Sequence, residues 1–351
     1  MISNAFLMLL FCTESVRAAT RISEGEQEIL WQAVQRARGI YAEPRAACFG
    51  DEICAADAVL VVSFNKGYTA FFNNWACHAN RLGLKYLVWP MGRFQLQPDL
   101  RHATVFTSAM TDGSIETDGP MSIKRREFNR LSAAKLMVVN EIINLKTHVW
   151  FSDVDVVFLS DPWAAMANLR RTLKCDYQFQ LEAHHDFRRK VGGNTGFHLF
   201  RASNASVAAI QNALVRCHLV PGKHEQANFW DALVARKGFD IIIDANRIDT
   251  ATWSLRPGIS ELPNMTVVPW NATDFTVLPS DVRLRACPLP KDLFPSGKGH
   301  EYTRVAQPEW VIFHANFVVG WERKRNMLQR KGLWGSAEGN HTQFACVSMH
   351  R

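Results

Sequence analysis

Two acidic residues separated by a single valine, Asp153 and Asp155, lie among hydrophobic residues in the segment 150–159. The residues just before them, 148–151, are typical of a strand, and in a parallel α/β sheet the carboxyl ends of the strands face the ligand crevice. Carboxylates suit Mn²⁺ or Mg²⁺, and they are costly to bury unless a cation or hydrogen bonds compensate them. The pair predicts a divalent metal site; the alternative is that one aspartate caps the turn into Asp161-Pro162.

A glycine-rich segment, Gly192-Gly193-Asn194-Thr195-Gly196, precedes another predicted strand. Glycines allow the backbone to approach a ligand closely, and the amide of Asn194 offers donors and acceptors to sugar hydroxyls. Taken alone, the segment fits an ordinary glycine-rich turn equally well.

A third segment contains His314, Gly320 and Lys324. His314 ends an apolar run, where a neutral imidazole could complete a metal shell, although a hydrogen-bonded core histidine is the alternative. Gly320 and Lys324 lie near the start of a predicted helix, which is a favourable place for a phosphate.

The elements that must position these groups alternate between strands and helices. An apolar strand over 58–63, a turn, a helix over 68–82 and a strand over 85–89 form a βαβ unit. Further strands are expected over 148–151, 177–181, 196–201, 239–243 and 310–314, and helices over 124–145, 207–216, 226–236 and 321–331. This order predicts one α/β domain with a mixed, mostly parallel sheet flanked by helices. The segment 250–310, rich in proline and glycine, is expected to be irregular apart from short strands at 265–268 and 275–278.

The composition excludes several classes of protein. With 47% hydrophobic residues in 351, the chain is not disordered, and no apolar run reaches the ~20 residues of a membrane span. A net charge of +7 permits an anionic partner. The basic clusters are short and no zinc-finger or RNA-binding motif is present, so nucleic acid is not expected as a partner.

The N-terminal region predicts the secretory pathway. The apolar residues 5–12 suit a signal peptide with a cleavage site at 16–18, although a positive n-region is missing and a buried helix is the alternative. Eight cysteines and four glycosylation sequons, at Asn204, Asn264, Asn271 and Asn340, favour secretion.

Among the cysteines, Cys48 and Cys54 flank a polar turn and could close a small disulfide, and the pairing of the others stays open. If Cys12 is removed with a signal peptide, at least one thiol is free or intermolecular. We expect a signal peptide or short hydrophobic segment over 1–18, a stem over 19–56 that contains a polar helix over 24–38, a globular domain over 57–334 and a tail over 335–351.

In their order and combination, these segments resemble the nucleotide-diphospho-sugar transferase family that includes plant cell-wall arabinosyl- and xylosyltransferases. The resemblance extends from about Asp57 to Trp334. It is carried by Val61-Val-Ser-Phe-Asn-Lys-Gly-Tyr68 with Asn74-Trp75, Phe128 with Lys135, Phe151-Ser-Asp-Val-Asp155 with Asp161-Pro162, Asn194-Thr-Gly-Phe197, and His314-Ala-Asn316 with Gly320, Lys324 and Leu333-Trp334. It implies a GT-A (Rossmann-like) fold, a nucleotide-sugar donor such as a UDP-sugar, Mn²⁺ or Mg²⁺, a glycan or glycoprotein acceptor, retention of anomeric configuration, and a place in the Golgi lumen.

The resemblance also implies roles for single residues. Asp153 and Asp155 would bind metal and nucleotide, and His314 would complete the metal shell. The other donor-binding positions are Lys135, then Phe64, Asn65 and Tyr68 for base and ribose, Asn194 and Gly196 beside the sugar, and Gly320 and Lys324 for the diphosphate.

Glu225-Gln226 stands where the family has Asp-Gln, so Gln226 would face the reacting carbon and Glu225 would bind sugar hydroxyls; the alternative is that both only begin a helix. Glu225, and Glu182 at the end of strand 177–181, are one methylene longer than the expected aspartate. This departure could change the sugar that fits or weaken activity.

Two other functions compete with this interpretation. A haloacid dehalogenase-type phosphatase also uses Asp-x-Asp after a strand, but it needs the motif near the start of the core and a later acidic pair, and the sequence contains no Asp-Asp dipeptide. A secreted sugar- or nucleotide-binding protein of the same fold without catalysis is suggested by Glu225 and Glu182, whereas Asp153, Asp155, His314 and Lys324 argue against it.

Overall fold

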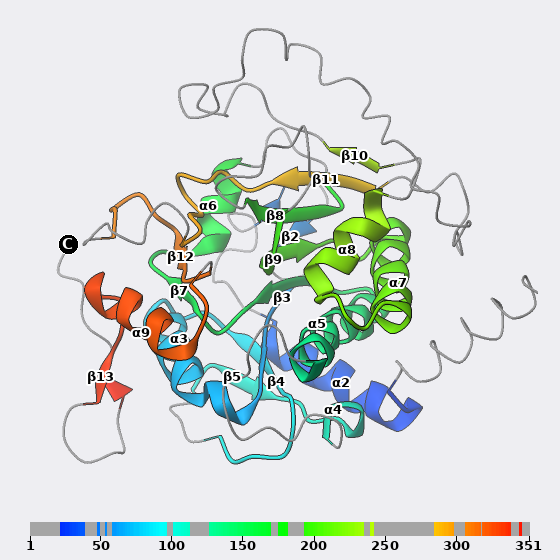
Figure 1. The fold of residues 1–351 in the computed structure, drawn as a ribbon, viewed down its shortest axis with the longest axis horizontal. Coiled ribbons are helices and arrows are strands. Elements are labelled where there is room, and N and C mark those ends of the chain that lie inside the picture. Colours follow the sequence, from blue (N-terminus) through cyan, green and yellow to red (C-terminus); the bar gives the residue numbers. More distant parts are fainter. Residues whose placement is uncertain are drawn as a thin grey trace, which may run out of the picture.

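The computed structural model describes residues 22–38, 48–49, 53–54, 58–96, 101–112, 126–169, 175–181, 193–234, 239–241, 284–297, 306–316, 318–337 and 344–345. An eight-stranded sheet runs through them in the order β10-β11-β8-β9-β6-β3-β4-β5 (Figure 1). Its strands are β3 (Ala58–Phe64), β4 (Tyr86–Pro90), β5 (Ala103–Val105), β6 (His148–Ser152), β8 (Tyr177–Leu181), β9 (Gly193–Phe200), β10 (Phe239–Ile241) and β11 (Leu284–Pro288). Strand β9 runs antiparallel to both of its neighbours, and the other adjacent strands are parallel.

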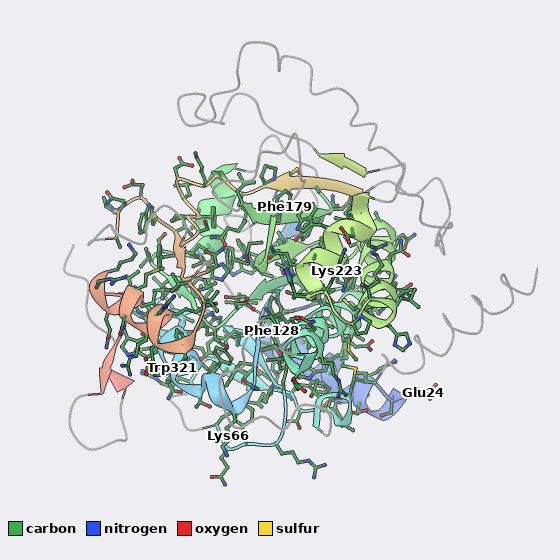
Figure 2. All side chains as sticks on the ribbon, viewed as in Figure 1. Glu24, Lys66, Phe128, Phe179, Lys223 and Trp321 are labelled. Carbon is green, nitrogen blue, oxygen red and sulfur yellow. A yellow bond between two sulfur atoms is a disulfide. The ribbon has the colours of Figure 1, made fainter. Side chains whose placement is uncertain are left out.

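Two hydrophobic cores lie on the two faces of this sheet, and the alternation of side chains along β3 assigns each residue to one of them. Leu60 and Val62 point into one core, and Val59 and Val61 point into the other. Helices α3 (Thr69–Arg81), α6 (Pro162–Leu169) and α9 (Trp321–Arg330) cover the first face, and α2 (Glu24–Ala37), α5 (Arg126–Asn144), α7 (Asn204–Leu219) and α8 (Glu225–Val234) cover the second. Figure 2 shows how densely side chains fill the space between the sheet and the helices. The expected class, an α/β fold with a mixed and mostly parallel sheet flanked by helices, is confirmed.

Most of the predicted elements are present, with ends that differ by a few residues. The strand over 177–181 is β8, and the helix over 124–145 is α5, which buries Val138 and Ile142. The short elements that were not predicted include β5, α4 (Ala109–Asp112), β7 (Val156–Phe158), α6 and β11. Strand β11 lies inside the segment that we expected to be irregular.

The helix that we expected in a separate stem belongs to the folded domain. A capping box between Ser23 and Glu26 starts α2, and Leu30 and Val34 are fully buried against the sheet. Glu26 also accepts hydrogen bonds from Ser108 Oγ at 2.8 Å and Ala109 N at 2.9 Å. Residues 22–38 are therefore packed onto the domain, while the remaining boundaries at 18, 56 and 334 stay predictions.

A disulfide between Cys175 and Cys287 joins the segment before β8 to β11, and Cys77 is disulfide-bonded as well. Cys217 is the free cysteine of the described residues. Cys48 and Cys54 face each other in the register of β1 (Cys48–Phe49) and β2 (Ile53–Cys54).

Several predictions lie outside the described residues: the N-terminal segment 1–18, Glu182, the strands at 265–268 and 275–278, and the sequons at Asn264, Asn271 and Asn340. The remaining sequon residue, Asn204, is exposed at the start of α7. Among the helices of the described chain, none combines the length and the apolar character needed to cross a bilayer.

Candidate functional site

The two aspartates lie at the carboxyl end of β6, near the middle of the sheet. Asp153 directly follows Ser152, the last residue of β6, and Asp155 directly precedes β7. Their side chains differ in exposure, at 22% for Asp153 and 6% for Asp155. The strand-end position that the sequence predicts is therefore confirmed.

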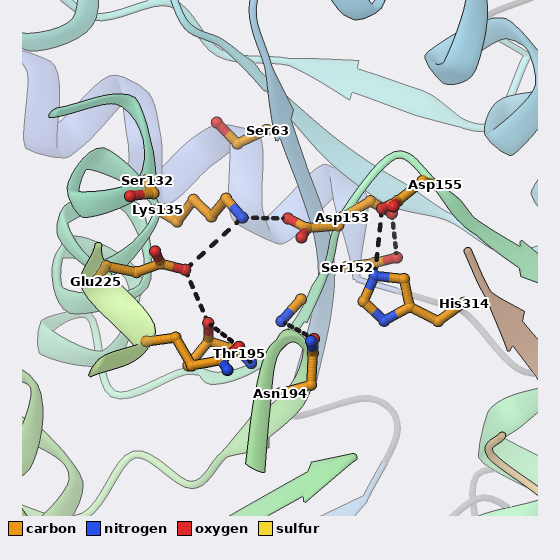
Figure 3. Close-up of polar contacts among 12 residues, drawn as sticks. Ser63, Ser132, Lys135, Ser152, Asp153, Asp155, Asn194, Thr195, Glu225 and His314 are labelled. Atoms are coloured by element: carbon orange, nitrogen blue, oxygen red, sulfur yellow. Dashed lines mark hydrogen bonds and ion pairs between the residues drawn. The ribbon is translucent and has the colours of Figure 1, made fainter. Parts of the chain in front are cut away.

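His314 reaches Asp155 through backbone pairing of two short strands. Strand β12 (Ile312–His314) runs antiparallel to β7, with His314 opposite Val156, and Ala315 N donates to Asp155 O at 2.9 Å. The Nε2 atom of His314 lies 3.3 Å from Oδ1 of Asp155 (Figure 3). One ligand atom each from Asp153, Asp155 and His314 can be chosen so that all three lie within 4.8 Å of one another.

Gly196 keeps the space between these three side chains open. It lies on β9 beside the end of β6, where its carbonyl accepts a 2.6 Å hydrogen bond from Asp153 N. A Cβ atom at this position would lie 2.5 Å from both Asp153 Oδ2 and His314 Cε1. Only glycine fits without displacement, so two carboxylates and one imidazole can surround a single point. This donor set suits a divalent cation, and Asp153, Asp155 and His314 could hold one.

Two lysines neutralise the aspartates. Lys135, from the middle of α5, lies 2.6 Å from Asp153 Oδ1, and Lys324, from α9, lies 2.5 Å from Asp155 Oδ2. Burial lowers the pKa of Lys135, but Asp153 and Glu225 outweigh burial, so its pKa is raised above the ordinary value. Burial raises the pKa of Asp155, but its contacts, chiefly the ammonium of Lys324, lower it by more, so this pKa lies well below the ordinary value. Both ammonium groups and the Asp155 carboxylate are therefore charged at neutral pH.

The Glu225-Gln226 pair begins α8 and meets the glycine-rich segment through Thr195. Glu225 Oε1 accepts from Thr195 Oγ1 at 2.7 Å and lies 3.8 Å from Lys135 Nζ, as Figure 3 shows. Gln226 Oε1 accepts from Thr195 N at 3.2 Å. Burial raises the pKa of Glu225, but Lys135 and the hydrogen bond from Thr195, with smaller contributions from His224 and Ser132, together lower it by more, so that pKa lies below its ordinary value. Glu225 is thus an ionised partner of Lys135 as well as the first residue of a helix.

The remaining predicted residues differ in their surroundings. Asn194 lies at the centre of the site, where its Oδ1 accepts from Gly196 N at 2.6 Å. Tyr68 is half-buried near the same charges, and burial is the main cause of its raised pKa. Phe64 and Asn65 are buried, and Phe64 stacks on Phe72 with ring centroids 4.4 Å apart, so the ring of Phe64 belongs to the core. Gly320 is exposed at the N-terminus of α9 with a φ of 101°.

Two residues of the site were missed by the sequence analysis. Thr195 lies inside a predicted motif but was not assigned a role, although it links Glu225 to Gln226. Gln180, on β8, contacts His314 with 2.7 Å between Oε1 and Nδ1. The available signal was the sequence of β8, Tyr-Gln-Phe-Gln-Leu, because two glutamines in a buried strand require polar partners.

A model of one protein family matches residues 99–328, which is well over half of the chain, and that family is described as nucleotide-diphospho-sugar transferase. Among characterised proteins, the chain is similar to the beta-arabinofuranosyltransferase RAY1 of Arabidopsis thaliana, with 22% identity over 214 residues. That match includes 59% of this chain and 34% of RAY1, so the chain spans about a third of the length of this relative.

Solved structures with a related fold include two glycosyltransferases. GlyE of Streptococcus pneumoniae TIGR4 has 15% identity and a TM-score of 0.33, over 50% of this chain and 42% of GlyE. LgtC, solved in complex with donor and acceptor sugar analogs, has 13% identity and a TM-score of 0.38, over 64% of this chain and 85% of LgtC. On the extent of the family match, the chain belongs to the nucleotide-diphospho-sugar transferase family and has the α/β architecture expected of its GT-A fold.

Proposed function

We propose that the chain is a metal-dependent glycosyltransferase that moves a sugar from a nucleotide diphosphate to a glycan or glycoprotein acceptor, with retention of anomeric configuration. The observation that carries this proposal is the convergence of Asp153, Asp155 and His314 at one point, flanked by the ammonium groups of Lys135 and Lys324. We expect Mn²⁺ or Mg²⁺ as the metal and a UDP-sugar as the donor.

The charge of the site supports a divalent cation together with an anionic ligand. Among the described residues, Asp153, Asp155 and Glu225 are paired with two ammonium groups, those of Lys135 and Lys324, so these five side chains together carry one net negative charge. A divalent cation would reverse the sign of this charge and make the site attractive to a diphosphate. When bound, such a cation neutralises charge that develops on a leaving diphosphate.

Among the described residues, Lys324 is the one best placed to help the leaving group. Its side chain is 24% exposed and its Nζ contacts Asp155 Oδ2, at the edge of the predicted metal site. Gly320, four residues earlier, accepts the first hydrogen bond of α9 from Lys324 N at 3.2 Å. An ammonium group on the first turns of a helix provides positive charge where a phosphate oxygen would bind.

For the retaining step, we keep Gln226 as the residue that faces the reacting carbon. The hydrogen bond from Thr195 N fixes the Gln226 amide beside Asn194 and Gly196. Glu225 already binds Lys135 and Thr195, so a role as nucleophile would require it to leave both partners. We therefore assign Glu225 to sugar hydroxyls and to the placement of Lys135.

The donor sugar and the location are further parts of the proposal. RAY1 is named a beta-arabinofuranosyltransferase, which makes a pentose donor the first to test beside hexoses. The disulfide between Cys175 and Cys287 is typical of the secretory pathway, and we place the protein in the Golgi lumen.

A panel of nucleotide sugars tests this function. Purified protein with Mn²⁺ is expected to hydrolyse one or a few of them slowly, and EDTA should abolish the reaction. Asp153→Ala and Asp155→Ala should be inactive, whereas Asp231→Ala should keep wild-type activity because Asp231 pairs with Arg216 and Lys223 on another part of the surface. Full activity in EDTA would overturn metal dependence. Nucleotide binding without turnover of any donor would instead favour a binding protein.

A further inference from the structure

Gln180 is a fully buried glutamine whose amide group is completely used by three partners. Its Nε2 donates to Phe294 O at 3.0 Å and to Pro295 O at 2.8 Å, and its Oε1 lies 2.7 Å from His314 Nδ1. The orientation of the amide follows from these contacts, because the opposite orientation would place Oε1 against two carbonyl oxygens.

The orientation of Gln180 determines which nitrogen of His314 carries a proton. Since Oε1 can only accept, Nδ1 of His314 must donate, and in the neutral ring Nε2 then keeps its lone pair. It is Nε2 that faces Asp155, at 3.3 Å from Oδ1. A ring held in this form presents its free lone pair to the point between the aspartates, where a metal ligand is needed.

An irregularity in the sheet brings Gln180 to this position. The register between β8 and β9 shifts between Phe179, which pairs with His198, and Gln180, which pairs with Asn194. Such bulges bend a strand and redirect its side chains, often beside active sites. The shift therefore places Gln180 and Asn194 next to each other at the edge of the site.

Backbone hydrogen bonds hold the segment that carries the two carbonyls, Phe294 O and Pro295 O, and Phe294 N itself donates to Pro290 O at 2.8 Å. Leu289 N donates to Phe179 O at 2.8 Å, which binds the segment after β11 along β8. Val311 N donates to Leu293 O at 2.8 Å, and Ser296 pairs with His314. Gln180, its carbonyl partners and His314 thus form one connected unit.

We propose that Gln180 is a positioning residue that holds His314 as the Nδ1–H tautomer, so that Nε2 can bind a divalent cation. The binding of a cation by Nε2 rests on the proposed function. The tautomer of His314 does not, because it is a property of the metal-free protein.

Long-range ¹H–¹⁵N spectra of histidine-labelled, metal-free protein test the tautomer at about pH 8, with His314 assigned from the His314→Gln variant. A proton on Nδ1 and none on Nε2 is expected, and the opposite tautomer would overturn the proposal. Absence of Mn²⁺ binding to wild-type protein that has the Nδ1–H form would contradict the proposed function while supporting the role of Gln180.

Two variants and a matched control test the effect on metal affinity. Gln180→Leu should weaken Mn²⁺ binding in calorimetry by about 10- to 100-fold, as expected when the outer partner of a metal-binding histidine is lost. Gln180→Glu keeps an acceptor for Nδ1 and should keep the Nδ1–H signal that Gln180→Leu loses, but it sets its second oxygen against Phe294 O and Pro295 O and should therefore lower the free energy of unfolding. Gln178→Leu makes the same substitution at another buried position of β8 and should bind Mn²⁺ like wild type. Equal losses in Gln180→Leu and Gln178→Leu, or unchanged affinity in Gln180→Leu, would refute the proposal.

Discussion

The ammonium of Lys135 lies 2.6 Å from Oδ1 of Asp153 and so joins the middle of α5 to the end of β6. The same ammonium is 3.8 Å from Glu225, and the side chain of Lys135 is 17% exposed. One lysine therefore balances a predicted metal ligand and a residue of the predicted sugar site at the same time. This arrangement makes Lys135 important both for stability and for the charge of the site.

Replacing Lys135 should destabilise the protein. Lys135→Met leaves Asp153 and Glu225 without their shared cation, and uncompensated buried charges are costly, so the free energy of unfolding should fall by about 2–3 kcal/mol in urea titrations near pH 7. Lys223→Met is the matched control, because Lys223 pairs with Asp231 where both side chains are largely exposed, at 43% and 40%. A surface pair of this kind contributes about 0–1 kcal/mol. Similar losses in the two variants would contradict this role of Lys135.

A methyl group at Gly196 should close the site without unfolding the chain. In Gly196→Ala, the new Cβ would meet Asp153 Oδ2 and His314 Cε1 at 2.5 Å, so the stabilisation by Mn²⁺ in a thermal melt should be lost. Gly222→Ala serves as control, since nothing lies within 4 Å of a Cβ at that exposed turn. If Gly196→Ala keeps the wild-type shift with Mn²⁺, the metal site is not where we place it.

Two buried histidines should make the folded protein less stable as the pH decreases. Burial, aided by Lys135, lowers the pKa of His198 to about 3, and burial, aided by Arg81, lowers the pKa of His78 to about 4. The unfolded chain takes up these protons near pH 6.5 and the folded chain does not, so the free energy of unfolding decreases as pH falls from about 6.5 toward 3–4. The pKa values of Asp155 and Glu225 are lowered in the folded protein, so their ionised carboxylates stabilise it. This stabilisation is lost as the pH falls below about 4, the ordinary pKa of a carboxyl group.

His198→Phe tests this origin of the pH dependence. His198 stacks on Phe151 with centroids 5.4 Å apart, so a phenyl ring fits the aromatic surroundings. The urea midpoint of the variant should fall less between about pH 7 and pH 5 than that of the wild type. An equally steep fall would show that protonation of His198 in the unfolded chain is not the cause.

Gln226 should matter for turnover more than for binding of the nucleotide. With a donor identified, Gln226→Ala is expected to lower kcat at least about tenfold, since an oriented group beside the reacting carbon is lost, while nucleotide affinity stays near wild type. Glu225→Asp restores the residue expected of the family and should keep or raise activity. Gln329→Ala, at an exposed position of α9, is the control. Normal kcat in both Glu225→Ala and Gln226→Ala would mean that the pair only caps α8.

The sequence predicted the main strands and helices because their apolar patterns are long and regular. Residues near one another in the chain were enough to predict the strand over 58–63 and the helix that buries Val138 and Ile142. Strands β5 and β7 have three residues each, so their patterns carry little information, and β11, with the sequence Leu-Arg-Ala-Cys-Pro, has no regular apolar pattern. The packing of α2 onto the sheet was missed because a largely polar helix gives no sign of the partner that buries Leu30.

The site was predictable where its residues form local motifs. Asp153 and Asp155 follow a strand, and their strand-end position needs only the pattern of 148–155. Gln180 contacts His314, 134 positions further along the chain, and this contact depends on the bulge in β8. Lys135 contacts Glu225, 90 positions further along, and this contact depends on where α8 begins. Pairings of this kind arise from tertiary structure, and no pattern along the chain encodes them.

The central claim is that Asp153, Asp155 and His314 hold a divalent cation through which the nucleotide diphosphate binds. Calorimetric titration of UDP into metal-free protein, with Mn²⁺ or with EDTA, measures this directly in the wild type and in Asp155→Asn. We predict UDP binding that requires Mn²⁺ in the wild type and is lost in Asp155→Asn. Equal UDP affinity in EDTA, or unchanged Mn²⁺-dependent binding in Asp155→Asn, would contradict the claim.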